Sequence, residues 1–216
     1  MFKSFLSILY PPRCPLCDEL RPNRHICENC RESLHVLEGD FTAPHLKRVW
    51  FRRARSCFTY EGKLVDAIHG FKYSRRFDLT PVFARFLADE GRRIGEYDFI
   101  LPIPLHWLRL WMRGYNPSAI LARSLGRQLE IAVDCHALKK RKNILPQVGL
   151  ERDLRLQNVR GAFRIMPKRI PYLQGKDILL IDDVLTTGAT VNECAKMLMK
   201  KAGCESVDVL TIARTI

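Results

Sequence analysis

The 216-residue sequence has no apolar run long enough to cross a bilayer, so we expect no transmembrane segment. Residues 1–10 are apolar, but the stretch is short, stops at Pro11-Pro12 and has no small-residue cleavage site after it. We therefore predict a short helix packed on the body rather than a secretory signal, a membrane-surface anchor being the alternative. Without export, the eight cysteines should stay reduced in the cytoplasm.

Negative charge is also scarce. The chain has 23 acidic residues against 36 lysines and arginines, which gives a net charge of +13. Such a surface attracts polyanions, either nucleic acid or phosphorylated ligands, and charge alone does not separate the two. Hydrophobic residues make up 47% of the chain, enough for the core of one α/β domain with a small additional segment.

Neither the G-x-x-x-x-G-K-[ST] nor the G-x-G-x-x-G phosphate motif is present. What stands out instead is the stretch 177–201, DILLIDDVLTTGATVNECAKMLMKK. Its apolar run at 178–181 predicts a buried parallel strand, followed by Asp182 and Asp183. The turn 186–190 then leads into a helix, for which Thr190 and Glu193 fit a capping box and Gly203 a C-terminal stop.

This order of elements predicts a sugar-phosphate site. The N–H groups of a turn at a helix N-terminus favour a phosphate, and Gly188 lets the phosphate approach closely. The threonines of the turn add hydroxyl donors. Asp182 and Asp183 only accept hydrogen bonds, so they suit ribose hydroxyls or water on a metal ion. The prediction requires both carboxylates to be open to solvent.

Two C-x-x-C pairs precede this region, Cys14 with Cys17 and Cys27 with Cys30. Four thiolates in two such pairs fit a structural Zn²⁺ site, which a segment too short to bury a core needs in order to fold. His25 could replace one cysteine, and a redox pair or plain core thiols are the alternatives. We expect the isolated Cys57, Cys135, Cys194 and Cys204 to be buried apolar side chains.

Between these regions the patterns predict strands at 54–60, 97–101 and 207–213 and helices at 62–70 and 81–93. Basic residues mix with aromatics at 47–55 and 71–76, where a single-stranded nucleic acid could stack, but a solvated surface is the favoured interpretation. The basic segment 139–160 is predicted as a flap over a ligand, with a nucleic-acid contact or a solvated loop as alternatives.

The string at 182–190 resembles the signature of type I phosphoribosyltransferases, in which two acidic residues precede a T-T-G-x-T turn. The resemblance implies that phosphoribosyl pyrophosphate (PRPP) binds here, together with Mg²⁺. It further implies that the loop at Pro104 and the cations Arg113, Arg141 and Arg155 meet the pyrophosphate. The implied PRPP-binding residues of the string itself are Asp182, Asp183, Thr186, Thr187, Gly188, Ala189 and Thr190.

The order of motifs along the chain resembles the ComF family, competence-associated proteins with a phosphoribosyltransferase-like domain. The paired C-x-x-C motifs, the Pro-x-Pro at 102–104, Arg113-Gly-Tyr-Asn116 and Gly161-Ala-Phe163 fit this family. Pro117 and Ile144 depart from its usual Gln and Thr. The resemblance implies a zinc-binding segment at 1–40 and a mostly parallel α/β phosphoribosyltransferase-like domain at 41–216.

Two functions from different classes follow from this resemblance. The first is a PRPP-binding protein in DNA uptake, with single-stranded DNA and the uptake machinery as partners. The second is a catalytic phosphoribosyltransferase in nucleotide salvage, which would displace pyrophosphate from C1 of the ribose. Asp182 and Asp183 would then stabilise the positive sugar, and Arg113 with Mg²⁺ the leaving group. A zinc-containing DNA-binding module with a vestigial sugar site is a third possibility.

Overall fold

The computed structural model describes residues 11–21, 25–43, 46–141 and 159–216. Within these residues, five parallel strands form one sheet in the order β1-β7-β6-β2-β3. They are β1 (Arg53–Thr59), β2 (Phe99–Pro102), β3 (Ala132–Val133), β6 (Asp177–Leu185) and β7 (Ser206–Arg214). A separate antiparallel pair joins β4 (Leu138–Lys140) to β5 (Phe163–Ile165). The predicted α/β fold with a mostly parallel sheet is confirmed.

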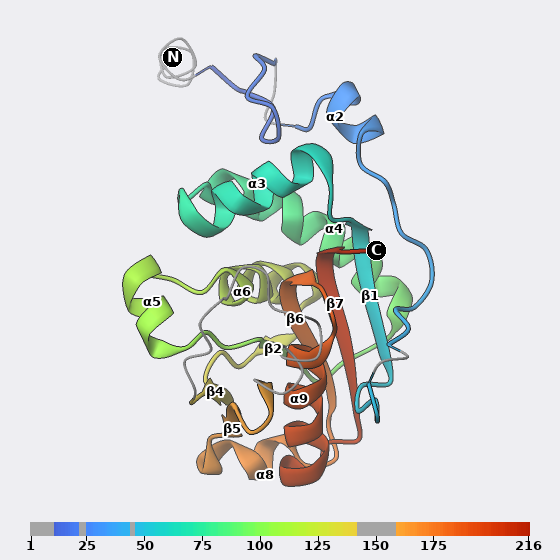
Figure 1. Ribbon diagram of the computed structural model, residues 1–216, viewed down its shortest axis with the longest axis vertical. Coiled ribbons are helices and arrows are strands. Elements are labelled where there is room, and N and C mark those ends of the chain that lie inside the picture. The colour runs from blue at the N-terminus through green and yellow to red at the C-terminus, as the bar shows by residue number, and fades with distance from the viewer. Residues whose placement is uncertain (1–10, 22–24, 44–45, 142–158) are drawn as a thin grey trace.

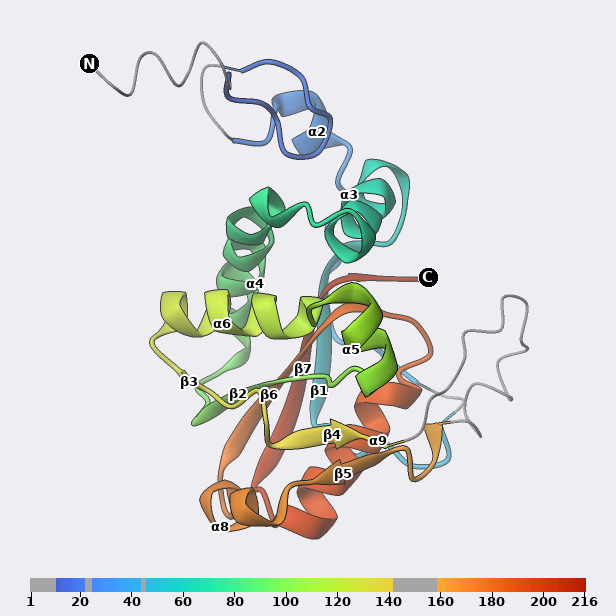
Figure 2. The same cartoon turned by 90° about the vertical axis from the view of Figure 1, so that its left-hand side faces the viewer.

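Helices cover both faces of the sheet (Figure 1 and Figure 2). One face packs against α3 (Gly62–Tyr73), α4 (Thr80–Ile94) and α6 (Pro117–Leu129). The other packs against α8 (Ile170–Leu173), α9 (Ala189–Met197) and the β4–β5 pair. Shorter helical segments are α2 (Glu28–Glu32), α5 (Trp107–Arg113), η1 (Phe77–Leu79), η2 (Pro167–Arg169) and η3 (Leu198–Ala202). Among the described helices, none is long and apolar enough to span a bilayer.

Strand β6 lies inside the sheet and divides its side chains between the two cores. Leu179 and Ile181 belong to the cluster under α3, α4 and α6, whereas Ile178 and Leu180 belong to the cluster under α9. All four side chains are fully buried. This is the alternation that a strand covered on both faces must have, and it explains why the sequence shows a continuous apolar run.

Most predicted elements are confirmed with shifted bounds, and the helix predicted at 62–70 continues to Tyr73. The first two residues of the segment predicted as a flap, 139–160, belong to strand β4. The rest of the flap, residues 142–158, lies outside the described residues, as does the helix predicted at 1–10. The prediction of a capping box at α9 is wrong, because Gly188 is the N-cap residue and no side chain caps the helix.

The contacts of Glu193 explain the missing capping box. Its Oε1 accepts a hydrogen bond from the backbone N–H of Gly161 at 3.0 Å and so ties α9 to the chain before β5. The predicted helix stop at Gly203 is confirmed, since this residue caps the π-helical turn η3 with a φ of 66°. Thus a tertiary contact from its second turn holds α9, and the π-helical turn η3 that continues it ends at a left-handed glycine.

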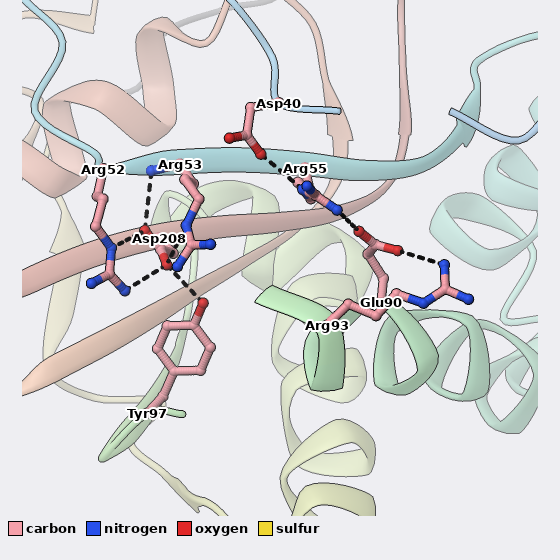
Figure 3. Close-up of polar contacts among 8 residues, drawn as sticks. All are labelled: Asp40, Arg52, Arg53, Arg55, Glu90, Arg93, Tyr97 and Asp208. Atoms are coloured by element: carbon pink, nitrogen blue, oxygen red, sulfur yellow. Dashed lines mark hydrogen bonds and ion pairs between the residues drawn. The ribbon is translucent and has the colours of Figure 1, made fainter. Parts of the chain in front are cut away.

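A buried carboxylate of β7 joins the start of β1 to the segment before β2 (Figure 3). Asp208 of β7 has no exposed surface and accepts hydrogen bonds from Arg52 Nη2 at 2.8 Å and from the Tyr97 phenol at 2.7 Å. It also accepts one from the backbone N–H of Arg53 at 3.0 Å. The hydrogen bond to Asp208 raises the pKa of Arg52 above its usual value.

A second arginine of the basic stretch 47–55 is also used in ion pairs (Figure 3). Arg55 bridges Asp40 at 2.8 Å and Glu90 at 2.7 Å, and so links the chain before β1 to helix α4. The favoured interpretation of a solvated surface therefore does not describe Arg52 and Arg55, both of which form ion pairs within the fold. These two guanidinium groups stabilise the fold through ion pairs and are not available to bind a nucleic acid.

Candidate functional site

Asp182 and Asp183 lie inside β6, before it ends at Leu185. Consecutive strand residues alternate between faces, but the partners of both carboxylates, Ser118 and Lys72, come from helices α6 and α3 on one face of the sheet. Asp182 is half-buried, whereas Asp183 is only 7% exposed. The expectation that both carboxylates are open to solvent is therefore wrong for Asp183.

Lys72 neutralises the buried Asp183. Its Nζ lies 2.9 Å from Asp183 Oδ1, and the lysine side chain is itself only 18% exposed. Burial alone lowers the pKa of Lys72, but the charge of Asp183 and their hydrogen bond outweigh it, so the pKa is raised. The interpretation of residues 71–76 as surface decoration is consequently wrong for Lys72.

Asp182 is held from helix α6. Ser118 Oγ donates to Asp182 Oδ1 at 2.8 Å. Just before it, Asn116 caps α6 by accepting from the Ser118 N–H at 3.1 Å, and it donates through Nδ2 to the Ile103 carbonyl at 2.9 Å. The loop after β2, the start of α6 and Asp182 are therefore joined by one chain of hydrogen bonds.

The environment of Asp182 disfavours its charge. Burial and then the nearby charge of Asp183 raise the pKa of Asp182 to about 7, although the hydrogen bond from Ser118 acts in the opposite direction. Pro117, which departs from the family pattern, occupies the first turn of α6, where proline is well tolerated. The structure thus accommodates this departure in the helix start without disturbing the contact to Asp182.

Residues 186–188 form the turn between β6 and α9. Thr186 is exposed, Thr187 and Thr190 are half-buried, and Gly188 and Ala189 are buried. Gly188 has a φ of 72°, and a Cβ on it would lie 2.9 Å from Cε1 of Phe41. Sequence reasoning assigned this glycine to phosphate approach alone; the structure adds a left-handed backbone and a ring packed against it.

The remaining predicted residues lie at varied places around this edge of the sheet. Pro104 is half-buried in the loop after β2, and β2 runs parallel to β6 as its neighbour, so their carboxyl ends share one edge. Arg113 ends α5 with its guanidinium 4.6 Å from the centre of the Tyr73 ring. The Arg141 N–H donates to the Ala162 carbonyl at 2.7 Å. Arg155 lies outside the described residues.

Lys140 is a half-buried cation that the sequence analysis did not single out. Burial and the nearby charge of Arg109 lower its pKa, while the charge of Asp182 acts in the opposite direction. A bridge between His106 and Lys140 sets β4 beside the start of α5. Lys72, Ser118 and Lys140 were missed because nothing in their local spacing signals that they meet the end of β6.

The four paired cysteines come together as predicted. The ligand atoms of Cys14, Cys17, Cys27 and Cys30 all lie within 4.8 Å of one another. Sulfur atoms at the corners of a tetrahedron around Zn²⁺ lie about 3.8 Å apart, since each Zn–S bond is about 2.3 Å. The Cys17 and Cys27 Sγ atoms are 3.7 Å apart. Four thiols at this spacing fit a closed structural Zn²⁺ site.

Comparison with protein families agrees with both parts of this description. A family model described as double zinc ribbon domain matches residues 5–41. A second, described as phosphoribosyl transferase domain, matches residues 112–215 and so includes β6, the turn and α9. The fold and the site therefore define a phosphoribosyltransferase-type α/β protein with an N-terminal zinc ribbon.

Comparison with curated relatives identifies the family within this class of protein. Competence protein F of Haemophilus influenzae is 34% identical over 155 residues, which cover 68% of this chain and 66% of that protein. DNA utilization protein YhgH of Shigella flexneri is 34% identical over 163 residues, which cover 73% of this chain and 70% of that protein. Adenine phosphoribosyltransferase from Thermoanaerobacter pseudethanolicus, a solved structure, aligns at 16% identity with a TM-score of 0.40, covering 67% of this chain and 83% of that chain. The chain belongs to the competence protein F (ComF) family.

Proposed function

We propose that this protein binds PRPP at the turn between β6 and α9 and acts in DNA uptake. The observation that carries the proposal is the meeting of three features at one edge of the sheet. They are the N-terminus of α9 after the 186–188 turn, the half-buried Asp182, and the loop after β2 that Asn116 connects to Asp182. A helix N-terminus favours phosphate, and a carboxylate beside it accepts hydrogen bonds from a diol.

Different residues of the 182–190 string would bind different parts of PRPP. The hydroxyls of Thr186, Thr187 and Thr190 and the backbone N–H groups of Gly188 and Ala189 suit the 5-phosphate. Asp182 suits the ribose hydroxyls, and Asp183 would join it only by exchanging its ion pair with Lys72. Mg²⁺ binds through carboxylate and phosphate oxygens, which Asp182 and the ligand would supply, and it would neutralise the pyrophosphate.

The pyrophosphate end would lie toward the loop at Pro104. Arg113 and Arg141 are proposed partners for it, and so is Arg155, which lies outside the described residues. Lys140 is a further cation in this region. It is close enough to Asp182 for the charge of this carboxylate to affect the pKa of Lys140. A cluster of cations suits a leaving group that carries several negative charges.

The names of the relatives and the charge of the chain support the biological role. One relative is named competence protein F and another DNA utilization protein. The net charge of +13 favours contact with a polyanion, for which we propose single-stranded DNA and the uptake machinery as partners. Four thiolates that hold Zn²⁺ suit a reducing compartment, and we propose the cytoplasm.

Isothermal titration calorimetry with PRPP and Mg²⁺ tests the binding proposal. Wild type should bind, and Asp182→Ala should weaken binding at least about tenfold, because one hydrogen bond to a charged group is lost. Asp89→Ala is the matched control. It removes a carboxylate from an exposed position on α4 and should bind like wild type. No heat of binding from folded, zinc-loaded wild type would refute the proposal.

The second candidate is a catalytic phosphoribosyltransferase in nucleotide salvage, which the matched phosphoribosyl transferase domain favours. Release of pyrophosphate from PRPP is then measured with a panel of nucleobases as acceptors. Release that depends on one base would establish turnover. If PRPP binds but no base causes pyrophosphate release, the protein has the binding role and the catalytic role is refuted.

A further inference from the structure

Helix α5 presents large apolar side chains to solvent. Trp107 is 67% exposed, Trp111 79%, Met112 73% and Leu110 43%, and the helix buries none of its residues. The helix lies at the left side of the molecule in Figure 1 and faces the viewer in Figure 2. A contiguous exposed apolar patch on a folded domain marks an interaction site, whereas single exposed residues do not.

The exposed face of α5 continues onto the end of α3. Tyr73 is 70% exposed and lies under the Arg113 guanidinium, 4.6 Å from ring centre to carbon. Arg75 is exposed, and its Nη2 would lie 3.5 Å from a Cβ placed on Gly114. The Tyr115 hydroxyl donates to the Phe71 carbonyl at 2.5 Å, which ties the two helices together. We call Tyr73, Arg75, Trp107, Leu110, Trp111 and Met112 the α3–α5 aromatic surface.

The charge around this surface has one sign. Residues 99–129, which include all of α5 and α6, contain no aspartate or glutamate, and neither do residues 71–77. The nearby Asp78 is paired with Arg76 at 2.9 Å. Exposed aromatic rings surrounded by arginines and separated from carboxylates complement a ligand with flat faces and negative charge.

We propose that the α3–α5 aromatic surface binds single-stranded DNA by stacking bases on Trp107 and Trp111, with Arg75 beside the phosphates. The inference rests on the proposed role in DNA uptake and gives that role a location. Trp107 and Trp111 are one helical turn apart, about 6 Å along the axis. Stacked bases in a duplex are about 3.4 Å apart, so only a strand with separated bases can use both rings.

A bilayer surface is the other macromolecular ligand for exposed tryptophans and arginines. Membrane binding depends on apolar chains buried below the headgroups. Here two of the four exposed apolar residues of α5 are indoles, and the adjacent ring already carries a stacked guanidinium. Flat groups dominate the surface, which favours bases over acyl chains.

The three tryptophans allow a direct test. The third, Trp50, is half-buried between Arg48 and Lys200, at 4.0 and 5.1 Å from its ring centre. In Trp50→Phe protein, indole fluorescence reports only Trp107 and Trp111. Titration with a 15-nucleotide oligothymidine at low salt should quench it saturably, and a duplex of equal length should bind much more weakly. Arg75→Ala should lower the slope of affinity against salt concentration by about one.

Substitution of the rings completes the test. Trp107→Ala/Trp111→Ala should weaken oligothymidine binding at least about tenfold, measured by anisotropy of labelled DNA. The matched control is Tyr172→Ala, which removes a 66% exposed ring elsewhere. Equal DNA affinity of the double variant and wild type would overturn this location. So would fluorescence changes with anionic phospholipid vesicles but none with DNA.

Calorimetry with PRPP separates this inference from the proposed function. The Trp107→Ala/Trp111→Ala variant should bind PRPP like wild type. If wild type binds PRPP but no single-stranded DNA, the aromatic surface and the DNA partner are refuted and the PRPP site stands. If wild type binds DNA at another surface, only the location is refuted.

Discussion

Asp182 carries an unfavourable charge in the folded protein. An unfolded chain ionises aspartate near pH 4, whereas burial and the neighbouring Asp183 keep Asp182 protonated to about pH 7. Between these two values the folded state binds more protons than the unfolded state. The contribution of Asp182 to stability is therefore fully present below about pH 4 and is lost as the pH rises through about 7.

Asp182→Asn should remove this dependence. The free energy of unfolding of wild type should fall between pH 4 and 7 more steeply than that of the variant, and the variant should be the more stable protein at pH 8. Urea denaturation at pH 4.5 and 8 measures the difference. Asp89→Asn, at an exposed carboxylate, should leave the slope unchanged. A variant that is destabilised equally at both pH values would contradict the prediction.

At this scale the sequence singled out the candidate site residues but not the side chains that contact them. The acidic pair and the four cysteines were found because each group is contiguous or regularly spaced. Lys72 and Ser118 were not found, since each contacts the acidic pair from a distant helix. The burial of Asp183 follows from the same contacts, and no local pattern signals it.

Among the elements, the turn from β6 to α9 combines a left-handed backbone with close packing. Gly188 combines a φ of 72° with a Cβ position 2.9 Å from the Phe41 ring. Gly175 has a similar φ of 68°, but a Cβ there would meet nothing within 4 Å. The two glycines therefore separate the cost of the backbone conformation from the cost of the contact.

Gly175→Ala should destabilise the protein by about 1–2 kcal/mol, which is the penalty for a left-handed residue with a Cβ. Gly188→Ala should cost more than this, because the Phe41 ring must also move. Thermal denaturation of both variants, of Phe41→Ala and of Gly188→Ala/Phe41→Ala measures the coupling between Gly188 and Phe41. Equal losses for the two glycines would show that Phe41 does not constrain the turn.

Helices and strands were predicted correctly where their own residues show an apolar pattern. They were missed where the element depends on contacts with a distant segment. Helices α3 and α4 and strand β6 have long or continuous apolar patterns, and they were predicted with small errors in bounds. Helix α5 has no buried face to produce a periodic pattern. Strand β4 spans Leu138–Lys140 and exists through pairing with β5, so its basic sequence indicated a loop.

Across the whole molecule, the zinc ribbon lies at the far end from α8 and is held against α3 and the segment after it (Figure 1). Lys63 Nζ donates to Cys30 Sγ at 3.7 Å, and Arg76 Nη2 donates to the Pro15 carbonyl at 3.0 Å. The ribbon segment is too short to bury a large core. Its folding should therefore depend on the metal. Because the ribbon contacts α3, loss of the metal should also destabilise the start of α3.

Removal of Zn²⁺ should unfold the ribbon and loosen the start of α3 while leaving the sheet intact. Metal analysis of the purified protein should give one zinc per chain. After chelation, hydrogen exchange should accelerate at α2 and the first turn of α3, with β6 and β7 unchanged as internal controls. Absence of zinc, or unchanged exchange at α2 after its removal, would contradict the structural assignment.

The ring of Phe41 sits where the zinc ribbon region, matched at residues 5–41, gives way to the rest of the chain. Its backbone N–H also donates to the Ala54 carbonyl at 2.7 Å, so this position is anchored on β1. A shortened protein that begins at residue 42 would keep every strand of the sheet. It would nevertheless lose the Phe41 ring that packs against Gly188 in the turn that leads into α9, so removal of residues 1–41 would alter the proposed PRPP site.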